Sequence, residues 1–243
     1  MLRLGVQKVH GRALNILLTL RYNLHLQADG AVASFFGRHA EQLLNTTGSA
    51  QLKTACYQSQ IAQALEIKSR VEILRSSNSW GALVWQLNDV YPSGSWGSLE
   101  YGSLNRTGQV VGGRWRPLHY IMRREVWADS IASCGADGFC FVRSDGLDAL
   151  HAAVLTLTVL NLGTGQKTIA LTKRDIELGV GAGQLQRFCL AGEVRSGRCT
   201  PLQQALTSMG HGSCWEDGAP RPAHCVLEVE VRHHACSSGG VLL

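Results

Sequence analysis

The hydrophobic pattern of the chain changes its period near residue 125. Before that point, residues 50–75 repeat with helical spacing, so that apolar side chains fall on one face of a helix and polar ones on the other. After it, residues 154–160 are rich in β-branched side chains, and within residues 226–231 apolar and acidic side chains alternate strictly from Leu227 onward. The period of 2 points Leu227, Val229 and Val231 inward. The chain therefore combines a helical part with a β-sheet part.

The helical part ends in a short apolar run over residues 81–87, which does not alternate and predicts a strand buried on both faces. A helix followed by a buried strand is the βα rhythm of a parallel barrel or sheet. In the second part, glycine-rich and serine-rich connections separate the short strands, which favours a β-sandwich. We therefore predict an α+β chain with two domains, residues 1–125 and residues 126–243.

Composition excludes several classes of function. Apolar residues make up 45% of the chain and charged residues 17%, a globular balance. The net charge of +5 comes from scattered Lys and Arg residues, so we expect no nucleic-acid partner. No run approaches the roughly 20 apolar residues that a membrane span needs, so we expect no membrane partner. Residues 13–20 are apolar, but they favour an amphipathic helix over a signal peptide because Arg21 follows at once.

Cysteines and glycosylation sequons indicate the secretory route. Of 8 cysteines, Cys56 stands alone and the other seven lie between Cys134 and Cys236. The absence of C-x2-C spacing argues against a zinc site, and we expect neither a metal nor a cofactor. Many disulfide pairings remain open, with one cysteine left over. The sequons at Asn45 and Asn105 are predicted glycosylation sites.

The most unusual stretch is residues 80–120, where aromatic side chains alternate with polar ones. Sugar rings present apolar C–H faces that stack on indole rings, and hydroxyls that pair with side-chain donors and acceptors. The stretch therefore fits a carbohydrate site. The alternative is that the same aromatic side chains fill a core or a domain interface. The members of the string are Trp80, Trp85, Tyr91, Trp96, Tyr101, Trp115 and Tyr120.

The order of these residues resembles that of a known family. Residues 80–92 (Trp-Gly-Ala-Leu-Val-Trp-Gln-Leu-Asn-Asp-Val-Tyr-Pro) closely resemble the eighth-strand segment of glycoside hydrolase family 2 β-mannosidases. Residues 95–102 (Ser-Trp-Gly-Ser-Leu-Glu-Tyr-Gly) and 113–120 (Gly-Arg-Trp-Arg-Pro-Leu-His-Tyr, following Gly112) continue the resemblance, with residues 103–111 as an insertion. The segment is most similar to the exo-acting lysosomal β-mannosidases of animals and protists.

Weaker resemblances flank this segment. Residues 57–72 resemble the helix before the last barrel strand, and residues 120–160 resemble the linker and opening strands of the family's C-terminal domain. Cys214 and Cys225 resemble a paired cysteine near the family's C-terminus. The resemblance thus implies the C-terminal end of a (β/α)8 catalytic barrel over residues 1–125, followed by an immunoglobulin-like β-sandwich over residues 126–243.

The resemblance also implies a function. Such enzymes are retaining glycosidases that remove terminal β-D-mannose from the non-reducing end of oligosaccharides in glycoprotein breakdown, in the lysosome or along the secretory route. Two carboxylates about 5 Å apart carry out that reaction. In the family both precede the segment matched here, so we expect this chain to contain no catalytic residue and to be inactive alone. Glu100, in a Glu-Tyr-Gly triplet like that of the nucleophile, corresponds to a second triplet without a catalytic role.

The substrate-binding residues of this chain are expected to form one wall of the sugar site, because the C-terminal ends of barrel strands line the active site. Trp85 is expected to stack against mannose in the −1 subsite. Asn88 and Asp89 would hydrogen-bond its hydroxyls or, alternatively, cap the loop after the strand. Trp96 would border the pocket or pack on the sandwich. Trp115 and His119 are expected to be packing or interface residues.

Three functional hypotheses follow. The chain is part of a longer enzyme acting on β-mannoside oligosaccharides, or a non-catalytic carbohydrate-binding module, or a structural accessory sandwich. A lone end of a barrel leaves broad apolar faces uncovered, which argues against the second hypothesis. The sequence leaves the oligomeric state open.

Overall fold

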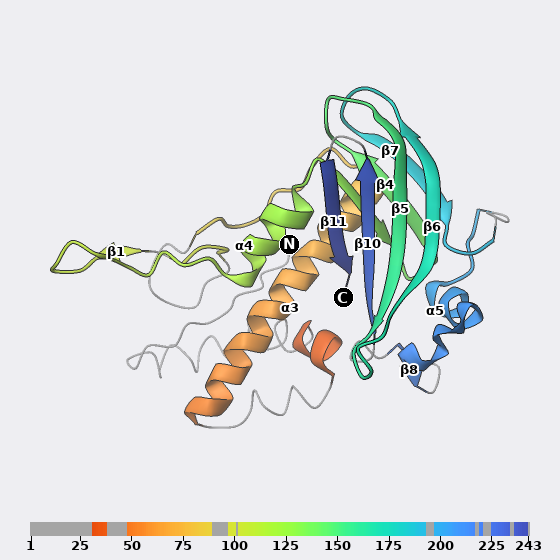
Figure 1. The fold of residues 1–243 in the computed structure, drawn as a ribbon. Coiled ribbons are helices and arrows are strands. Elements are labelled where there is room, and N and C mark those ends of the chain that lie inside the picture. The colour runs from red at the N-terminus through yellow and green to blue at the C-terminus, as the bar shows by residue number, and fades with distance from the viewer. Residues whose placement is uncertain are drawn as a thin grey trace. The chain divides into compact units, whose positions relative to one another are not determined.

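A computed structural model describes residues 31–37, 48–88, 97–100, 102–192, 197–216, 219–220, 225–233 and 236–242 (Figure 1). The chain divides into two compact units, which are described separately below. The first comprises Met1–Arg70 and Ala82–Met122, and the second Val71–Gly81 and Arg123–Leu243. The identities predicted for the two domains, a glycosidase barrel and an immunoglobulin-like sandwich, stay predictions.

The long helix α3 (Ser49–Ser76) confirms the helix predicted over residues 50–75. In the first unit its small side chains lie against two short segments. Ala62 packs against Ala31 and Val32 of a helical turn, and Ala64 packs against Leu118. Alanine favours helix and lets neighbouring segments approach closely, so this face of α3 is buried although the helix is only weakly amphipathic.

Helix α4 (Pro117–Ile121) follows the aromatic stretch, and the π-helical turn η1 (Met122–Val126) continues from it. Pro117 begins α4, where its missing N–H costs no hydrogen bond. Leu118 is buried against α3, and this contact fixes where the residues before α4 meet the long helix.

The structure differs from the sequence prediction over residues 81–87. No strand forms there, and the Leu83 and Trp85 side chains are 104% and 71% exposed, whereas a buried strand was predicted. The strand does not form because it lacks neighbouring strands to pair with among the described residues. A central parallel strand needs hydrogen-bonded neighbours on both sides. Within the described part of the chain, the one parallel pairing next to this stretch is the isolated bridge between Asn88, the residue that follows it, and Leu99.

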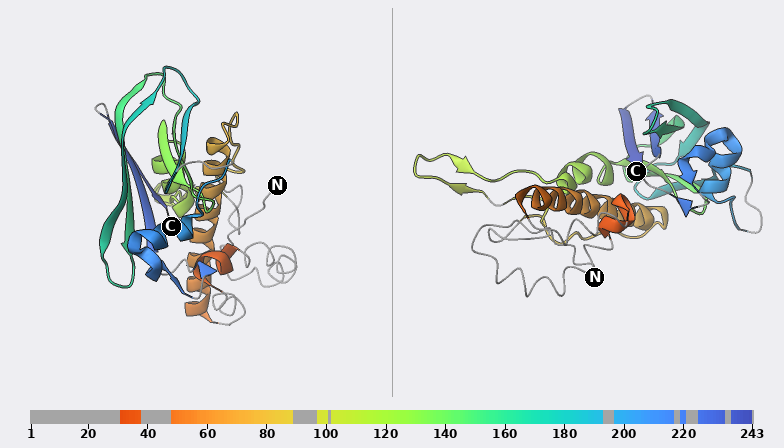
Figure 2. Two further views of the ribbon diagram at one scale, coloured as in Figure 1. Left: turned by 90° about the vertical axis from the view of Figure 1, so that its right-hand side faces the viewer. Right: turned by 90° about the horizontal axis from the view of Figure 1, so that it is seen from below.

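A small hairpin of two strands, β1 (Ser103–Leu104) and β2 (Val110–Val111), occupies the predicted insertion. The strands pair antiparallel, with Leu104 opposite Val110. Figure 1 and the right-hand view of Figure 2 both show this hairpin extending away from α4 within the first unit.

The second unit holds two antiparallel sheets. The 4-stranded sheet has the order β11-β10-β5-β6, and the 3-stranded sheet has the order β3-β4-β7. The strands of the larger sheet are β5 (Leu150–Asn161), β6 (Lys167–Leu178), β10 (Cys225–His233) and β11 (Cys236–Leu242). The strands of the smaller sheet are β3 (Ser130–Cys134), β4 (Phe139–Ser144) and β7 (Gln184–Cys189).

Short elements complete the unit between β7 and β10. They are the helix α5 (Leu202–Leu206), the turns η2 (Thr207–His211) and η3 (Gly212–Cys214), and the strands β8 (Trp215–Glu216) and β9 (Ala219–Pro220).

The two predicted strands lie within β5 and β10, which pair with each other in register from Cys225↔Asn161 to Arg232↔Val154. Val229 and Val231 are almost fully buried, as the alternation predicts. On the other face, Glu230 pairs with Arg232 and Glu228 pairs with Lys167. The period of 2 therefore places apolar side chains toward one core and ion pairs toward solvent.

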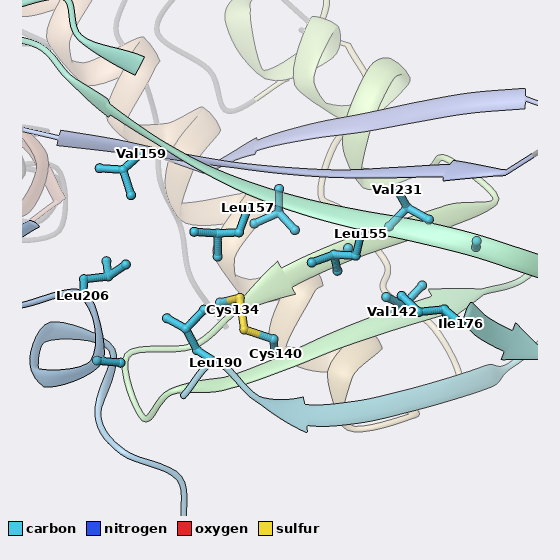
Figure 3. Packing of buried hydrophobic residues seen from close by; sticks show 14 of the residues in the cluster. Cys134, Cys140, Val142, Leu155, Leu157, Val159, Ile176, Leu190, Leu206 and Val231 are labelled. Atoms are coloured by element: carbon cyan, nitrogen blue, oxygen red, sulfur yellow. A yellow bond between two sulfur atoms is a disulfide. The ribbon is translucent and has the colours of Figure 1, made fainter. Parts of the chain in front are cut away.

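That core lies between the sheets and is shown in Figure 3. Leu155 and Leu157 of β5 are fully buried, and Val142 of β4 and Ile176 of β6 pack in the same cluster. Leu206 of α5 closes one end of it. At about 1.5–3 kcal/mol for each large aliphatic side chain buried, such a cluster is the main source of stability of this unit.

Three disulfides join cysteines of the second unit: Cys134–Cys140, Cys189–Cys199 and Cys214–Cys225. The last one is the pair that the family resemblance implied, and it is confirmed. The other two resolve pairings that the sequence left open. Cys56 of α3 lies outside all three, and burial raises the pKa of its thiol. The mixed helix-and-sheet class is confirmed, while the finer assignment to a barrel end and an immunoglobulin-like fold stays a prediction.

Candidate substrate-binding segment

The site is built from the stretch 81–88, which carries Trp85 and Asn88. Its backbone is fixed by residues 97–99. The N–H groups of Ser98 and Leu99 both donate to the carbonyl oxygen of Leu87, at 2.9 Å each. Two donors on one carbonyl, together with the Asn88–Leu99 bridge, hold the end of this stretch in place without a regular strand.

Ser98 is fully buried, and its hydroxyl strengthens the same junction. The Ser98 Oγ donates to the Leu87 carbonyl oxygen at 2.8 Å and lies 3.0 Å from Nδ1 of His119. A hydroxyl carries a single proton, so with that proton on the Leu87 carbonyl the contact to His119 is donated by Nδ1–H. His119 lies on α4, so this network ties the candidate segment to the helix that packs on α3.

A second link fastens residues 97–100 on their other side. The Arg116 N–H donates to the Ser98 carbonyl oxygen at 2.9 Å, and the buried Arg116 guanidinium donates to the Gly97 carbonyl oxygen at 3.0 Å. The Glu100 N–H donates to the Arg114 carbonyl oxygen at 2.8 Å. Residues 97–100 are therefore clamped between the stretch 81–88 and the residues before α4.

The Trp85 side chain is largely exposed on this fixed backbone, as are those of Leu83 and Leu87. The peptide bond that joins Trp85 to Gln86 is cis. Gln86 is itself held, since its carbonyl oxygen accepts from the Ser98 N–H at 3.2 Å. An exposed indole on a fixed backbone can offer its apolar face to a sugar ring, and only the side chain then loses conformational entropy on binding.

The other predicted site residues divide into two groups. Asn88 is exposed three residues after Trp85, so the structure brings these two onto one short fixed stretch. Asp89, Trp96 and the sequon residue Asn45 lie outside the described residues. The roles predicted for all the substrate-binding residues stay predictions.

The packing role expected of Trp115 is supported by its contacts. Its ring lies edge-on to His119, with centroids 4.5 Å apart, and to Tyr120, with centroids 5.1 Å apart. These geometries are typical of stabilising aromatic pairs. Within the aromatic string, Trp115 thus packs against His119 and Tyr120 of α4, whereas Trp85 is exposed.

The Glu100 carboxylate forms an ion pair with Arg114. The carboxylate accepts from Nε of Arg114 at 2.6 Å and from the same guanidinium at 3.2 Å, while the Glu100 side chain is only 11% exposed. A bidentate partner of this kind fixes and neutralises a carboxylate. Among the described residues, no group of three or more His, Cys, Asp or Glu side chains is arranged to hold a metal ion.

In the second unit, sequence reasoning missed a cluster of charged residues. Arg75, in the last turn of α3, donates to the carbonyl oxygens of Val126 and Ala128 at 2.8 and 2.9 Å. It also donates to the carboxylate of Asp145 at 2.8 Å. Arg143 donates to Asp145 at 2.9 Å and to the Arg75 carbonyl oxygen at 2.9 Å. No local motif predicts this cluster, because Arg75 lies 70 residues from Asp145 in the sequence.

Burial and the neighbouring charges change the pKa values of Arg75 and Asp145 in this cluster. Desolvation lowers the pKa of Arg75 from its ordinary value, although Asp145 opposes that change. Partial burial acts to raise the pKa of Asp145, but the hydrogen bond from Arg143 and the charge of Arg75 hold that pKa below its usual range. Asp145 also accepts from the Gly183 N–H at 3.0 Å, which adds to the lowering. The cluster is a structural junction of the second unit.

Comparison with solved structures shows what kind of fold the chain shares. An exo-chitosanase of Amycolatopsis orientalis matches with a TM-score of 0.56 over 89% of this chain and 21% of that one, at 13% identity. A second structure of this enzyme, in complex with PNP-β-D-glucosamine, matches with a TM-score of 0.57 over 94% of this chain and 24% of that one, also at 13% identity. At such identity the likeness concerns the fold alone.

Comparison with curated proteins gives closer relatives over part of the chain. β-Mannosidase of Mus musculus is 40% identical over 81 residues, or 30% of this chain and 8% of that protein. β-Mannosidase of Capra hircus is 37% identical over 83 residues, again 30% of this chain and 8% of that protein. β-Mannosidase A of Aspergillus oryzae is 31% identical over 138 residues, or 52% of this chain and 14% of that protein. No family model matches the chain.

The fold likeness and these relatives place the chain among proteins related to glycoside hydrolases. Within that class, the resemblance to a family 2 β-mannosidase predicted from residues 80–120 is confirmed. The chain spans less than a sixth of the length of these relatives. No helix among the described residues has the length and apolar character to cross a bilayer.

Proposed function

We propose that the chain supplies one wall of the sugar site of a β-mannosidase, a glycosidase that removes terminal β-D-mannose from the non-reducing end of oligosaccharides. The observation that carries the proposal is Trp85, an exposed indole on a backbone fixed through the buried Ser98. Apolar faces of hexoses stack on such rings, and a fixed backbone limits the entropy lost on binding to that of the side chain.

Asn88 would act beside Trp85. Its amide offers two donors and an acceptor, which suits the adjacent hydroxyls of a hexose. Because Asn88 bridges to Leu99 through the backbone, its position is set by the same clamp. Asp89 and Trp96 complete the proposed wall as sequence-based assignments.

The chemistry would come from elsewhere in a longer enzyme. A retaining glycosidase uses a nucleophilic carboxylate and an acid/base carboxylate about 5 Å apart, through a covalent glycosyl-enzyme. We assign Glu100 no catalytic role, because its triplet corresponds to the second, non-catalytic one of the family and because the ion pair with Arg114 lowers the basicity and nucleophilicity of its carboxylate. Alone, the chain would therefore bind mannosides weakly and hydrolyse none, and the full enzyme would act in the lysosome or along the secretory route.

Titration of the full chain with β-1,4-mannobiose, followed by tryptophan fluorescence, tests the sugar wall. We expect saturable quenching that Trp85→Ala weakens by about tenfold in affinity, since an aromatic contact contributes about 0.5–1.5 kcal/mol beyond its buried area. The matched control is Trp127→Ala, because Trp127 is also half exposed but lies in the second unit. Equal quenching in the wild type and the Trp85 variant would overturn the proposed wall.

Hydrolysis of p-nitrophenyl β-mannoside tests the second half of the proposal. We expect no release of nitrophenol above a reagent blank. If the wild-type chain released nitrophenol and Glu100→Gln did not, Glu100 would be catalytic. That result would refute the proposal that the catalytic carboxylates lie outside this chain.

A structural role is a second candidate, favoured by the separate core and three disulfides of the second unit. In that case Trp85→Ala would lower the free energy of unfolding, and mannobiose would leave the fluorescence of every variant unchanged.

A further inference from the structure

We propose that Asn105 is an N-glycosylation site and that its glycan covers the apolar β1–β2 hairpin. Residues 105–107 read Asn-Arg-Thr, which is an acceptor sequon. They form the turn of the hairpin, and every residue from 103 to 111 is exposed. An acceptor at an exposed turn is accessible on a folded or a folding chain. The proposal does not depend on the proposed function.

The side-chain geometry of the turn orients the acceptor amide. Oδ1 of Asn105 accepts from the N–H and Oγ1 of Thr107, at 2.9 and 2.7 Å, and from the N–H of Gln109 at 2.9 Å. Three donors on one oxygen fix the amide plane and polarise the amide. The amide nitrogen Nδ2 lies at the exposed tip, 3.3 Å from Oε1 of the exposed Gln109 side chain. That single exposed partner can move away when the nitrogen reacts.

The compartment is indicated by an independent feature. Three disulfides join cysteines of the second unit. Disulfides of this kind form and persist in oxidising environments such as the lumen of the endoplasmic reticulum, and they are rare in the cytosol. A chain that acquires them on that route passes the machinery that glycosylates asparagine.

The surface around the sequon shows what the glycan would do. Leu104, Val110 and Val111 are 70%, 68% and 56% exposed on a hairpin of only two strands. Two-stranded hairpins are marginally stable alone, and exposed apolar strands invite association with other chains. A bulky, hydrophilic glycan attached at the turn would screen these side chains from other molecules.

The modification is a group transfer. The Asn105 Nδ2 forms a bond to the anomeric carbon of an oligosaccharide carried on a lipid pyrophosphate. The bond between that carbon and the pyrophosphate oxygen breaks, the pyrophosphate leaves with the bonding electrons, and Nδ2 loses one proton to a base of the transferase. No oxidant or reductant is needed.

The test directs the full chain into the secretory route of a eukaryotic cell with an added leader. Asn45→Gln is present throughout, so that the sequon at Asn105 is the remaining one. Alkylation of free thiols before and after reduction shows that the chain reached the oxidising compartment. We expect a single mobility shift that peptide N-glycosidase abolishes, leaving Asp in place of Asn105 in the mass spectrum.

Matched variants separate modification from folding. Asn105→Asp keeps an oxygen that accepts the three turn hydrogen bonds but offers no amide nitrogen, so the shift should vanish while the fold persists. Thr107→Ser should retain the shift and Thr107→Ala should lose it. Unshifted protein whose disulfides have formed would overturn the site.

The covering role has its own readout. Enzymatic removal of the glycan should raise binding of an apolar fluorescent dye, and Leu104→Thr should suppress most of that rise. Equal dye binding before and after removal of the glycan would refute the covering role even where Asn105 is occupied.

Discussion

Replacing Arg75 with Met should destabilise the second unit, because the hydrogen bonds donated by the Arg75 guanidinium are lost. Arg75 donates to the carbonyl oxygens of Val126, Ala128 and Asp129 and to the carboxylate of Asp145. Its side chain is only 11% exposed. Methionine fills much of the same volume but donates nothing, so the variant isolates the hydrogen bonds from the packing.

The magnitude follows from how buried each partner is. A buried acceptor left without a donor costs about 1–3 kcal/mol, and the Val126 carbonyl is of this kind. Ala128 and Asp129 are partly accessible, so water replaces part of what their carbonyls lose. Asp145 is 33% exposed and keeps Arg143, so losing its pair with Arg75 adds little. We expect a total of about 3 kcal/mol, near the lower end of the range for breaking a buried ion pair.

Urea denaturation followed by circular dichroism of the sheets measures this change by linear extrapolation. The matched control is Arg70→Met on the same helix. Arg70 pairs with Glu66 one turn away and its side chain is 51% exposed, so its loss should cost about 0.3–0.5 kcal/mol. If the two variants lowered the free energy of unfolding equally, the reasoning that Arg75 anchors the second unit would be refuted.

Three further predictions follow from the same structure. Ser98→Ala should raise hydrogen exchange at residues 85–88 and weaken sugar quenching, because the Leu87 carbonyl and His119 lose a buried partner; unchanged exchange would contradict the clamp. Replacing Cys214 and Cys225 together with Ala should lower the free energy of unfolding by about 3 kcal/mol in urea denaturation, and a loss below about 0.5 kcal/mol would contradict a constraining role. The pKa of Asp145 is lowered in the fold, so its contribution is present above the unfolded pKa of about 3.9 and is lost as the pH falls below it. In acid unfolding experiments, the stability of Asp145→Asn should therefore fall less steeply with pH than that of the wild type. Parallel curves for the two proteins would contradict a contribution from Asp145.

The sequence by itself determined the elements whose hydrophobic pattern is local. The spacing over residues 50–75 predicted α3 to within a residue at each end, and the alternation over residues 226–231 predicted which side of β10 is buried. The period of 2 succeeds because it acts between neighbouring residues of one strand, whereas the period of 3.6 gave the extent of α3 but not its buried face, since Tyr57 is 62% exposed and Gln63 is buried. The order of rare residues in 80–120 also identified the β-mannosidase relatives, because a long ordered match carries more information than composition.

Tertiary structure decided the features that depend on residues far apart in sequence. The strand predicted over residues 81–87 does not form, since a strand exists only where neighbours pair with it. The cluster of Arg75, Arg143 and Asp145 was invisible for the same reason: its hydrogen bonds span up to 70 residues. Two of the three disulfides join cysteines only 6 and 10 residues apart, yet the sequence left their pairing open because seven cysteines cluster in the same half of the chain. Periodicity shows which face of an element is apolar, but packing alone decides which partner covers it.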